Sequence, residues 1–219
     1  MIKELWRELV KQQYNVLFSK TKLKEEYYNN KYPKQNISYS RTDKETIKID
    51  VRQFLNYNNF MLPKLIGTDD QKALRSLKWI ISNIKYTPDK TQYNLREYWA
   101  FPHETFNVRK GDCEDGAILL YSIMRKNNIP AWKIRISAGF VINSKKERSG
   151  HAYVTYYCEE SGEWVILDWC YYPNTRKIKD RESYLEEKMY EETWFSFNES
   201  FSWGKDGDIR KKPAKDILS

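Results

Sequence analysis

The chain has 219 residues, and 40 % of them are hydrophobic, enough to fill the core of one compact domain with extensions or of two small domains. Charged residues make up 31 % and no apolar run approaches the roughly 20 residues that a spanning helix needs, which argues against a membrane protein. The formal net charge is +8, but lysines and arginines are mixed with acids, so nucleic acid is not the expected partner.

The first 30 residues predict a helix, because apolar side chains recur at three- and four-residue steps from Leu5 to Phe18. This segment lacks the continuous apolar stretch of a secretory signal. The three cysteines of the chain, Cys113, Cys158 and Cys170, form no CxxC pair, which fits a reducing compartment. We therefore expect a cytoplasmic protein, located in a host cytoplasm or a virion if a phage encodes it.

The first of two central helices is predicted to begin at Thr68 or Asp69, which can cap it, and to end before Pro88. An aromatic-rich loop is expected over residues 88–111. A loop that long inside a compact domain is often functional.

The second central helix is predicted from Asp112 or Cys113 to about Asn127. Asp112 and Asp115 resemble a capping box at its start. Apolar residues cover more than one of its faces, so we expect it to be the buried central helix.

Three strands are predicted after this helix, over residues 131–142, 150–158 and 163–170. The short connection at 160–162 makes the second and third an antiparallel hairpin. From about Thr175 the sequence returns to a helical, acid-rich pattern and then to a polar end. These elements predict an α+β fold.

Cys113 lies where a turn becomes a helix, and two residues that can activate a thiol follow on the predicted strands. His151 and Asp168 lie at the same end of the hairpin and meet if they share a face, whereas a one-residue slip in register would separate them. Asp168 would accept a hydrogen bond from one imidazole nitrogen and leave the other for the thiol. Helix N-terminal amides favour a thiolate here, while the acids Asp112 and Glu114 oppose it.

Each of these residues also has a plain structural interpretation. Cys113 on an apolar helix face can be an inert core residue, and His151 a hydrogen-bonded structural one. Asp168 can begin a turn. The ordered combination of the three favours catalysis over these readings, whereas we interpret Cys158 and Cys170 as structural.

Five segments of the chain, taken together, are similar to the transglutaminase-like superfamily, and most similar to the bacterial transglutaminase-like cysteine peptidases of the LapG type. The resemblance runs over about residues 68–172. The segments that carry it are 98–105 (YWAFPHET), 111–115 (GDCED), 128–131 (NIPA), 150–152 (GHA) and 167–168 (LD).

The resemblance implies a papain-like core in which a helix bearing Cys113 packs on a small antiparallel sheet. It makes Cys113 the nucleophile, His151 the general base and acid, and Asp168 the residue that orients the imidazole. It also implies that Asp112 and Glu114 hold Ca²⁺, although capping of the helix is the alternative for both, and no other cofactor is required.

Two further expectations concern the surroundings of the thiol. The backbone N–H of Cys113 is one expected oxyanion donor, and the indole N–H of Trp99 is our candidate for the second. Family members commonly carry a bulky residue where Gly116 stands, so we expect looser packing there.

We expect a helical N-terminal extension over residues 1–60, a transglutaminase-like catalytic core over 61–175 and a C-terminal extension over 176–219. The predicted activity is acyl transfer by a peptidase or amidase that hydrolyses a peptide or carboxamide bond of a protein or peptide through a thioester. A cross-linking transglutaminase is one alternative. A non-enzymatic binding or structural protein, for example a component of a phage particle, is the other.

Overall fold

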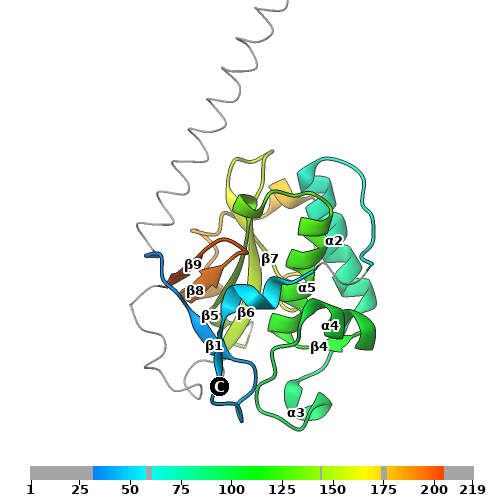
Figure 1. Cartoon of the computed structure of the whole chain (residues 1–219). Coiled ribbons are helices and arrows are strands. Elements are labelled where there is room, and N and C mark those ends of the chain that lie inside the picture. Colours follow the sequence, from blue (N-terminus) through cyan, green and yellow to red (C-terminus); the bar gives the residue numbers. More distant parts are fainter. Residues whose placement is uncertain (1–31, 58–60, 144, 174–176, 205–219) are drawn as a thin grey trace, which may run out of the picture.

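The computed structural model describes residues 32–57, 61–143, 145–173 and 177–204. The fold is α+β, as predicted, with helices packed on one side of a five-stranded antiparallel sheet (Figure 1). The strand order is β7-β6-β5-β8-β9. The strands are β5 (Ile134–Ile142), β6 (Arg148–Tyr157), β7 (Trp164–Leu167), β8 (Tyr190–Phe197) and β9 (Ser202–Gly204).

The central helix α5 (Cys113–Lys126) is buried at every position from Cys113 to Met124, which confirms the prediction for it. It packs against α2 (Asp69–Asn83) on one side and β6 on the other. Helix α2 begins as predicted, with Thr68 and Gln71 forming a capping box.

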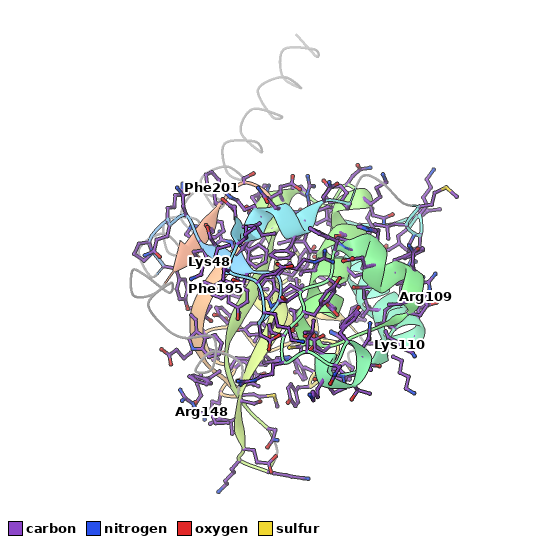
Figure 2. The ribbon with its side chains drawn as sticks, turned by 60° about the horizontal axis from the view of Figure 1, so that its bottom comes forward. Lys48, Arg109, Lys110, Arg148, Phe195 and Phe201 are labelled. Carbon is purple, nitrogen blue, oxygen red and sulfur yellow. The ribbon has the colours of Figure 1, made fainter. Side chains whose placement is uncertain are left out.

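The predicted β6–β7 hairpin is confirmed, with Val154 paired to Leu167. Because β7 ends at Leu167, Asp168 lies one residue beyond the sheet. The middle of the sheet is buried on both faces, since all of β7 and six consecutive residues of β6 are buried. In Figure 2, Phe195 of β8 lies in this interior, whereas Arg148 at the start of β6 is exposed.

The predicted loop over residues 88–111 contains regular structure, so that prediction is wrong in part. It holds α3 (Asp89–Gln92) and α4 (Pro102–Val108), and β4 (Lys110–Gly111) pairs in parallel with β3 (Lys85–Tyr86). Pro102 at the first position of α4 fits a helix start, because proline has no N–H to lose there. These short elements bring the loop back against the start of α5.

The described parts of both termini are not helical extensions, so that expectation is wrong for them. Residues 32–57 form the hairpin β1 (Ser38–Ser40) and β2 (Lys48–Asp50), followed by the 3-10 helix η1 (Val51–Leu55), which packs on the core. The predicted helix over 1–30 lies outside the described residues.

At the C-terminus a single 3-10 turn, η3 (Ile178–Asp180), precedes β8 and β9. The aromatic residues of β8 favour a strand, and β8 pairs with the edge of β5. The acid-rich local sequence predicts a helix here, because it contains no sign of this pairing. No helix in the described part of the chain is both long and apolar enough to cross a bilayer.

Candidate active site

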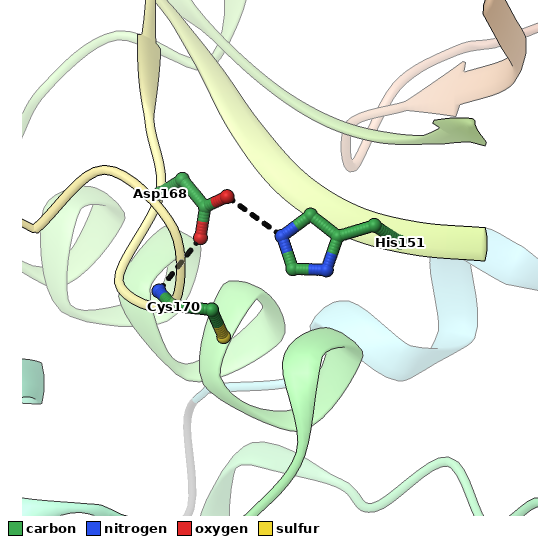
Figure 3. Close-up of side chains that lie close together, drawn as sticks. All are labelled: His151, Asp168 and Cys170. Carbon is green, nitrogen blue, oxygen red and sulfur yellow. Dashed lines mark hydrogen bonds and ion pairs between the residues drawn. The ribbon is translucent and has the colours of Figure 1, made fainter. Parts of the chain in front are cut away.

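His151 and Asp168 form a buried hydrogen-bonded pair at one end of the hairpin. The imidazole Nε2 lies 2.7 Å from Oδ2 of Asp168, and the side chains are 3 % and 0 % exposed (Figure 3). The prediction that the two share a face is therefore confirmed. Since Nε2 is engaged, Nδ1 is the nitrogen left for another partner.

Asp168 accepts two further hydrogen bonds. The hydroxyl of Tyr190 donates to Oδ2 at 2.7 Å, and the backbone N–H of Cys170 donates to Oδ1 at 2.7 Å. Burial alone would raise the pKa of this carboxyl, but His151 and the donors around it hold the pKa below its ordinary value. The carboxylate is thus ionised and fixed at both oxygens.

Cys113 is the first residue of α5, and its thiol is buried beside the backbone N–H of Ala152, the residue after His151. The thiol donates to Oε2 of Glu114 at 3.1 Å. Burial, and then the charge of Asp112, raise the pKa of the thiol well above its ordinary value. In this arrangement the sulfur is held as a thiol, and removing the negative charge around it would favour the thiolate.

The packing beside Cys113 is tight, contrary to the expectation for Gly116. A Cβ added to Gly116 would lie 2.2 Å from Nε1 of Trp169. That nitrogen also donates to the carbonyl of Cys113 at 3.4 Å. The bulk expected at residue 116 is supplied by Trp169 from the sheet side.

Trp99 is buried in the core, and its indole N–H donates to Oε1 of Glu97 at 2.5 Å. Its role as an oxyanion donor stays a prediction, and it would require this bond to break. The backbone N–H of Cys113 lies in the first turn of α5, where helical N–H groups have no partner within the helix.

Five carboxylates gather at the start of α5. The sequence indicated Asp112 and Glu114, and the fold adds three others. Oxygens of Asp89, Asp112 and Asp115 all lie within 4.8 Å of one another, as do those of Asp89, Glu97 and Glu114. Asp112 begins α5 without the side-chain cap that a capping box requires, so that prediction is wrong.

Four of these acids keep one buried oxygen without a hydrogen-bond partner among the described residues: Oδ1 of Asp89, Oδ1 of Asp112, Oε1 of Glu114 and Oδ2 of Asp115. Burial, and then the charge of Asp112, raise the pKa of Asp89 to about 7 and that of Glu97 to about 8. Burial likewise raises the pKa of the other three. Crowded, buried and unpaired carboxylates of this kind are typical of a cation site.

The other two cysteines differ in their surroundings. Cys158 is buried and donates to Oδ2 of Asp70 at 3.4 Å, a structural contact. Cys170 adjoins the candidate site instead, because its sulfur and the ligand atoms of His151 and Asp168 all lie within 4.8 Å (Figure 3). Cys170, which we interpreted as structural from the sequence, therefore has acid–base partners within reach, because it follows Asp168 by two residues and the turn brings it back.

Residues 63–169 match the family model of the transglutaminase-like superfamily. Among solved structures, LapG from Legionella pneumophila is similar at 20 % identity, with 69 % of this chain and 77 % of that chain covered and a TM-score of 0.49. The calcium-bound form of LapG matches at 20 % identity over 61 % and 67 % of the two chains, with a TM-score of 0.45. A search of curated protein sequences found no match.

Proposed function

Residues 63–169 belong to the transglutaminase-like superfamily, and on that basis we propose that the protein is a cysteine-dependent acyl-transfer enzyme. The proposed activity is that of a peptidase or amidase acting on a protein or peptide substrate. The observation that supports it most is the buried 2.7 Å pair of His151 and Asp168. Cys113 opens α5, and Trp169, the residue after Asp168, donates to its carbonyl.

In the proposed mechanism, Nδ1 of His151 takes the thiol proton and the sulfur of Cys113 attacks the substrate carbonyl. Asp168, bonded to Nε2, stabilises the imidazolium that results. The imidazolium then protonates the leaving amine, and a thioester remains on Cys113. Water, activated by the same imidazole, releases the acyl group and restores the thiol.

The backbone N–H of Cys113 is the proposed donor to the oxyanion of each tetrahedral intermediate. A donor of this kind is worth about 3 kcal/mol in the transition state. Trp99 remains the proposed second donor, subject to release of its bond to Glu97.

We propose that the carboxylate cluster holds Ca²⁺. Calcium–oxygen bonds of about 2.4 Å place two ligand oxygens at most about 4.8 Å apart, which the observed spacing of the carboxylates matches. Asp112 and Glu114 are the proposed ligands from the helix start, with Asp89 and Asp115 beside them. A bound cation would supply positive charge next to Cys113, which favours the thiolate. It would also engage the carboxylate of Glu114, which now accepts a hydrogen bond from the thiol.

An electrophilic amide probe tests the proposed activity. We expect covalent capture by the wild-type protein in calcium-containing buffer and none by Cys113→Ala. Cys158→Ala is the matched control, because it removes a buried thiol outside the site and should still be captured. Capture that persists in Cys113→Ala would contradict the assignment of the nucleophile.

The acyl acceptor distinguishes a hydrolase from a cross-linking enzyme. Water is the proposed acceptor, so a primary amine added to the reaction should not become bonded to the substrate. Product carrying the amine would instead support a transglutaminase.

One observation favours a non-enzymatic binding or structural role: the thiol of Cys113 is buried and donates a hydrogen bond to Glu114, and its burial raises the pKa of the thiol well above its ordinary value. Alkylation with iodoacetamide, with and without calcium, separates the two functions. An enzyme should show alkylation of Cys113 that calcium accelerates. A thiol that stays inert in the native protein under both conditions would support the structural role.

A further inference from the structure

Tyr190 lies outside the segment that matches the family, yet its hydroxyl reaches the centre of the candidate site. It is the first residue of β8, and its hydroxyl donates to Oδ2 of Asp168 at 2.7 Å. The same oxygen is bonded to Nε2 of His151, also at 2.7 Å. Oδ1 of Asp168 is held separately by the N–H of Cys170.

The carboxylate of Asp168 depends on these contacts for its orientation. It lies beyond the end of β7, and rotation of an aspartate carboxylate about its terminal torsion is only weakly restricted by the side chain itself. His151 is the group to be oriented, so it cannot also be the anchor. Tyr190 and the N–H of Cys170 are the donors that fix the two oxygens from outside the pair.

The ring of Tyr190 is itself held firmly. It packs edge-on against Tyr153, with 4.6 Å between ring centroids, in a buried cluster with Val141, Ile166 and Tyr184. The hydroxyl therefore meets Asp168 from a fixed position, and the bond is between a neutral donor and a buried charge, which is a strong kind of hydrogen bond.

From the contacts of Asp168 we propose that Tyr190 is a positioning residue: its hydroxyl fixes Asp168, which holds His151 through Nε2 and leaves Nδ1 as the nitrogen that can serve Cys113. The consequence for turnover rests on the proposed function, whereas the consequence for the imidazole rests on the contacts alone. The C-terminal strand β8 would thus complete a site whose other members lie on α5, β6 and the end of β7.

Tyr190→Phe removes only the hydroxyl and keeps the ring packing. The matched control is Tyr184→Phe, which also removes a buried hydroxyl from the same cluster, but one bonded to Thr193. Thermal unfolding of both variants measures the shared cost of losing a buried hydrogen bond. The difference between them isolates the contact with Asp168.

Two measurements are made on these variants. In the amidase assay, Tyr190→Phe should lower kcat about tenfold with KM unchanged, because the bond acts on the catalytic pair and not on substrate binding. In the proton NMR spectrum, the downfield resonance of the Nε2–H of His151 should move. The chain has two histidines, so a His103→Gln variant assigns this resonance.

The spectrum is recorded in a Cys113→Ala background, so it does not depend on turnover. An unchanged resonance, or an unchanged kcat, in Tyr190→Phe overturns the proposal, as does an equal effect of Tyr184→Phe. A wild-type protein that never forms an acyl-enzyme would end the proposed function instead. In that case the resonance alone decides whether Tyr190 positions the imidazole.

Discussion

The indole of Trp169 fills the space that a side chain at residue 116 would need. A Cβ on Gly116 would meet Nε1 of Trp169 at 2.2 Å and Cε2 at 2.3 Å. Trp169 follows directly after Asp168. The packing of its ring against Gly116 therefore also sets the distance between the end of β7 and the first turn of α5. The candidate triad depends on this close approach.

We expect Gly116→Ala to destabilise the protein by about 1–2 kcal/mol in urea unfolding. Alanine inside a helix is otherwise favoured over glycine by about 1 kcal/mol, so a loss of stability identifies the clash with the rigid indole. Gly162→Asn is the control. The φ of Gly162, +71°, suits asparagine, and a Cβ added there would lie 3.9 Å from its nearest neighbouring atom, so we expect little change in stability. A Gly116→Ala protein more stable than wild type would contradict the packing described.

Asp168→Asn should lower kcat/KM by about a thousandfold or more while the protein stays folded. The amide keeps the shape of the carboxylate but cannot stabilise an imidazolium at His151 as a charge does. Activity on the amide substrate and circular dichroism measure the two effects. Asp180→Asn, at an exposed acid, should leave the activity unchanged, and full activity of Asp168→Asn would refute the triad.

The carboxylate cluster makes stability depend on pH in the absence of calcium. The pKa of Asp89 rises from 3.8 to about 7 and that of Glu97 from 4.5 to about 8 on folding. Between about pH 4 and pH 8 the folded protein therefore binds more protons here than the unfolded chain, so stability falls as the pH rises through this window. In EGTA, we expect Tm to be lower at pH 8 than at pH 5.

Calcium should raise Tm more at pH 8 than at pH 5, because protons compete with it for the same oxygens. An Asp112→Asn, Glu114→Gln double variant should lose most of this response. A calcium effect of equal size in the double variant would place the ion elsewhere.

Glu199 should stabilise the protein only above acidic pH. It accepts bonds from the guanidinium of Arg125 at 2.6 and 2.9 Å, and the bonding to Arg125 lowers the pKa of the carboxyl below its ordinary value of 4.5. Its contribution is complete above that value and is lost as the pH falls through the folded pKa. We expect Glu199→Gln to cost about 1 kcal/mol at pH 7, and much less at pH 3, in urea unfolding.

The matched control for that variant is Glu191→Gln. Glu191 pairs with Arg148 on the exposed surface, where an ion pair contributes little. A loss at Glu199→Gln that stayed constant between pH 7 and pH 3 would mean that the contact is not electrostatic.

The parts of the site that could be predicted from the sequence are those fixed by local order. Cys113 follows a turn and opens an apolar helix, and His151 and Asp168 are joined by one short hairpin, so their meeting required only the register of two adjacent strands. The patterns that predicted these positions, a turn before a helix for Cys113 and a hairpin for His151 and Asp168, each span less than about 20 residues.

Asp89 and Tyr190 could not be predicted in the same way. Asp89 reaches the cluster because β3 and β4 pair and fold residues 88–111 back onto α5, and no local pattern of residue types specifies that return. Tyr190 reaches Asp168 because β8 pairs with β5. The charged sequence that contains β8 resembles a helix when it is read alone. Both contacts are set by tertiary pairing, which overrides local propensity.

The place of β8 between β5 and β9 has a consequence for any shortened form of the protein. A fragment cut at residue 175 would lack β8 and β9, so β5 would become an edge strand of the sheet. Its unpaired backbone N–H and C=O groups could then form hydrogen bonds with other molecules. Such a fragment should self-associate, and adding back a peptide of residues 177–204 should suppress that association. Strands β8 and β9 thus belong to the same sheet as the segment that matches the family, although they lie beyond its end at residue 169.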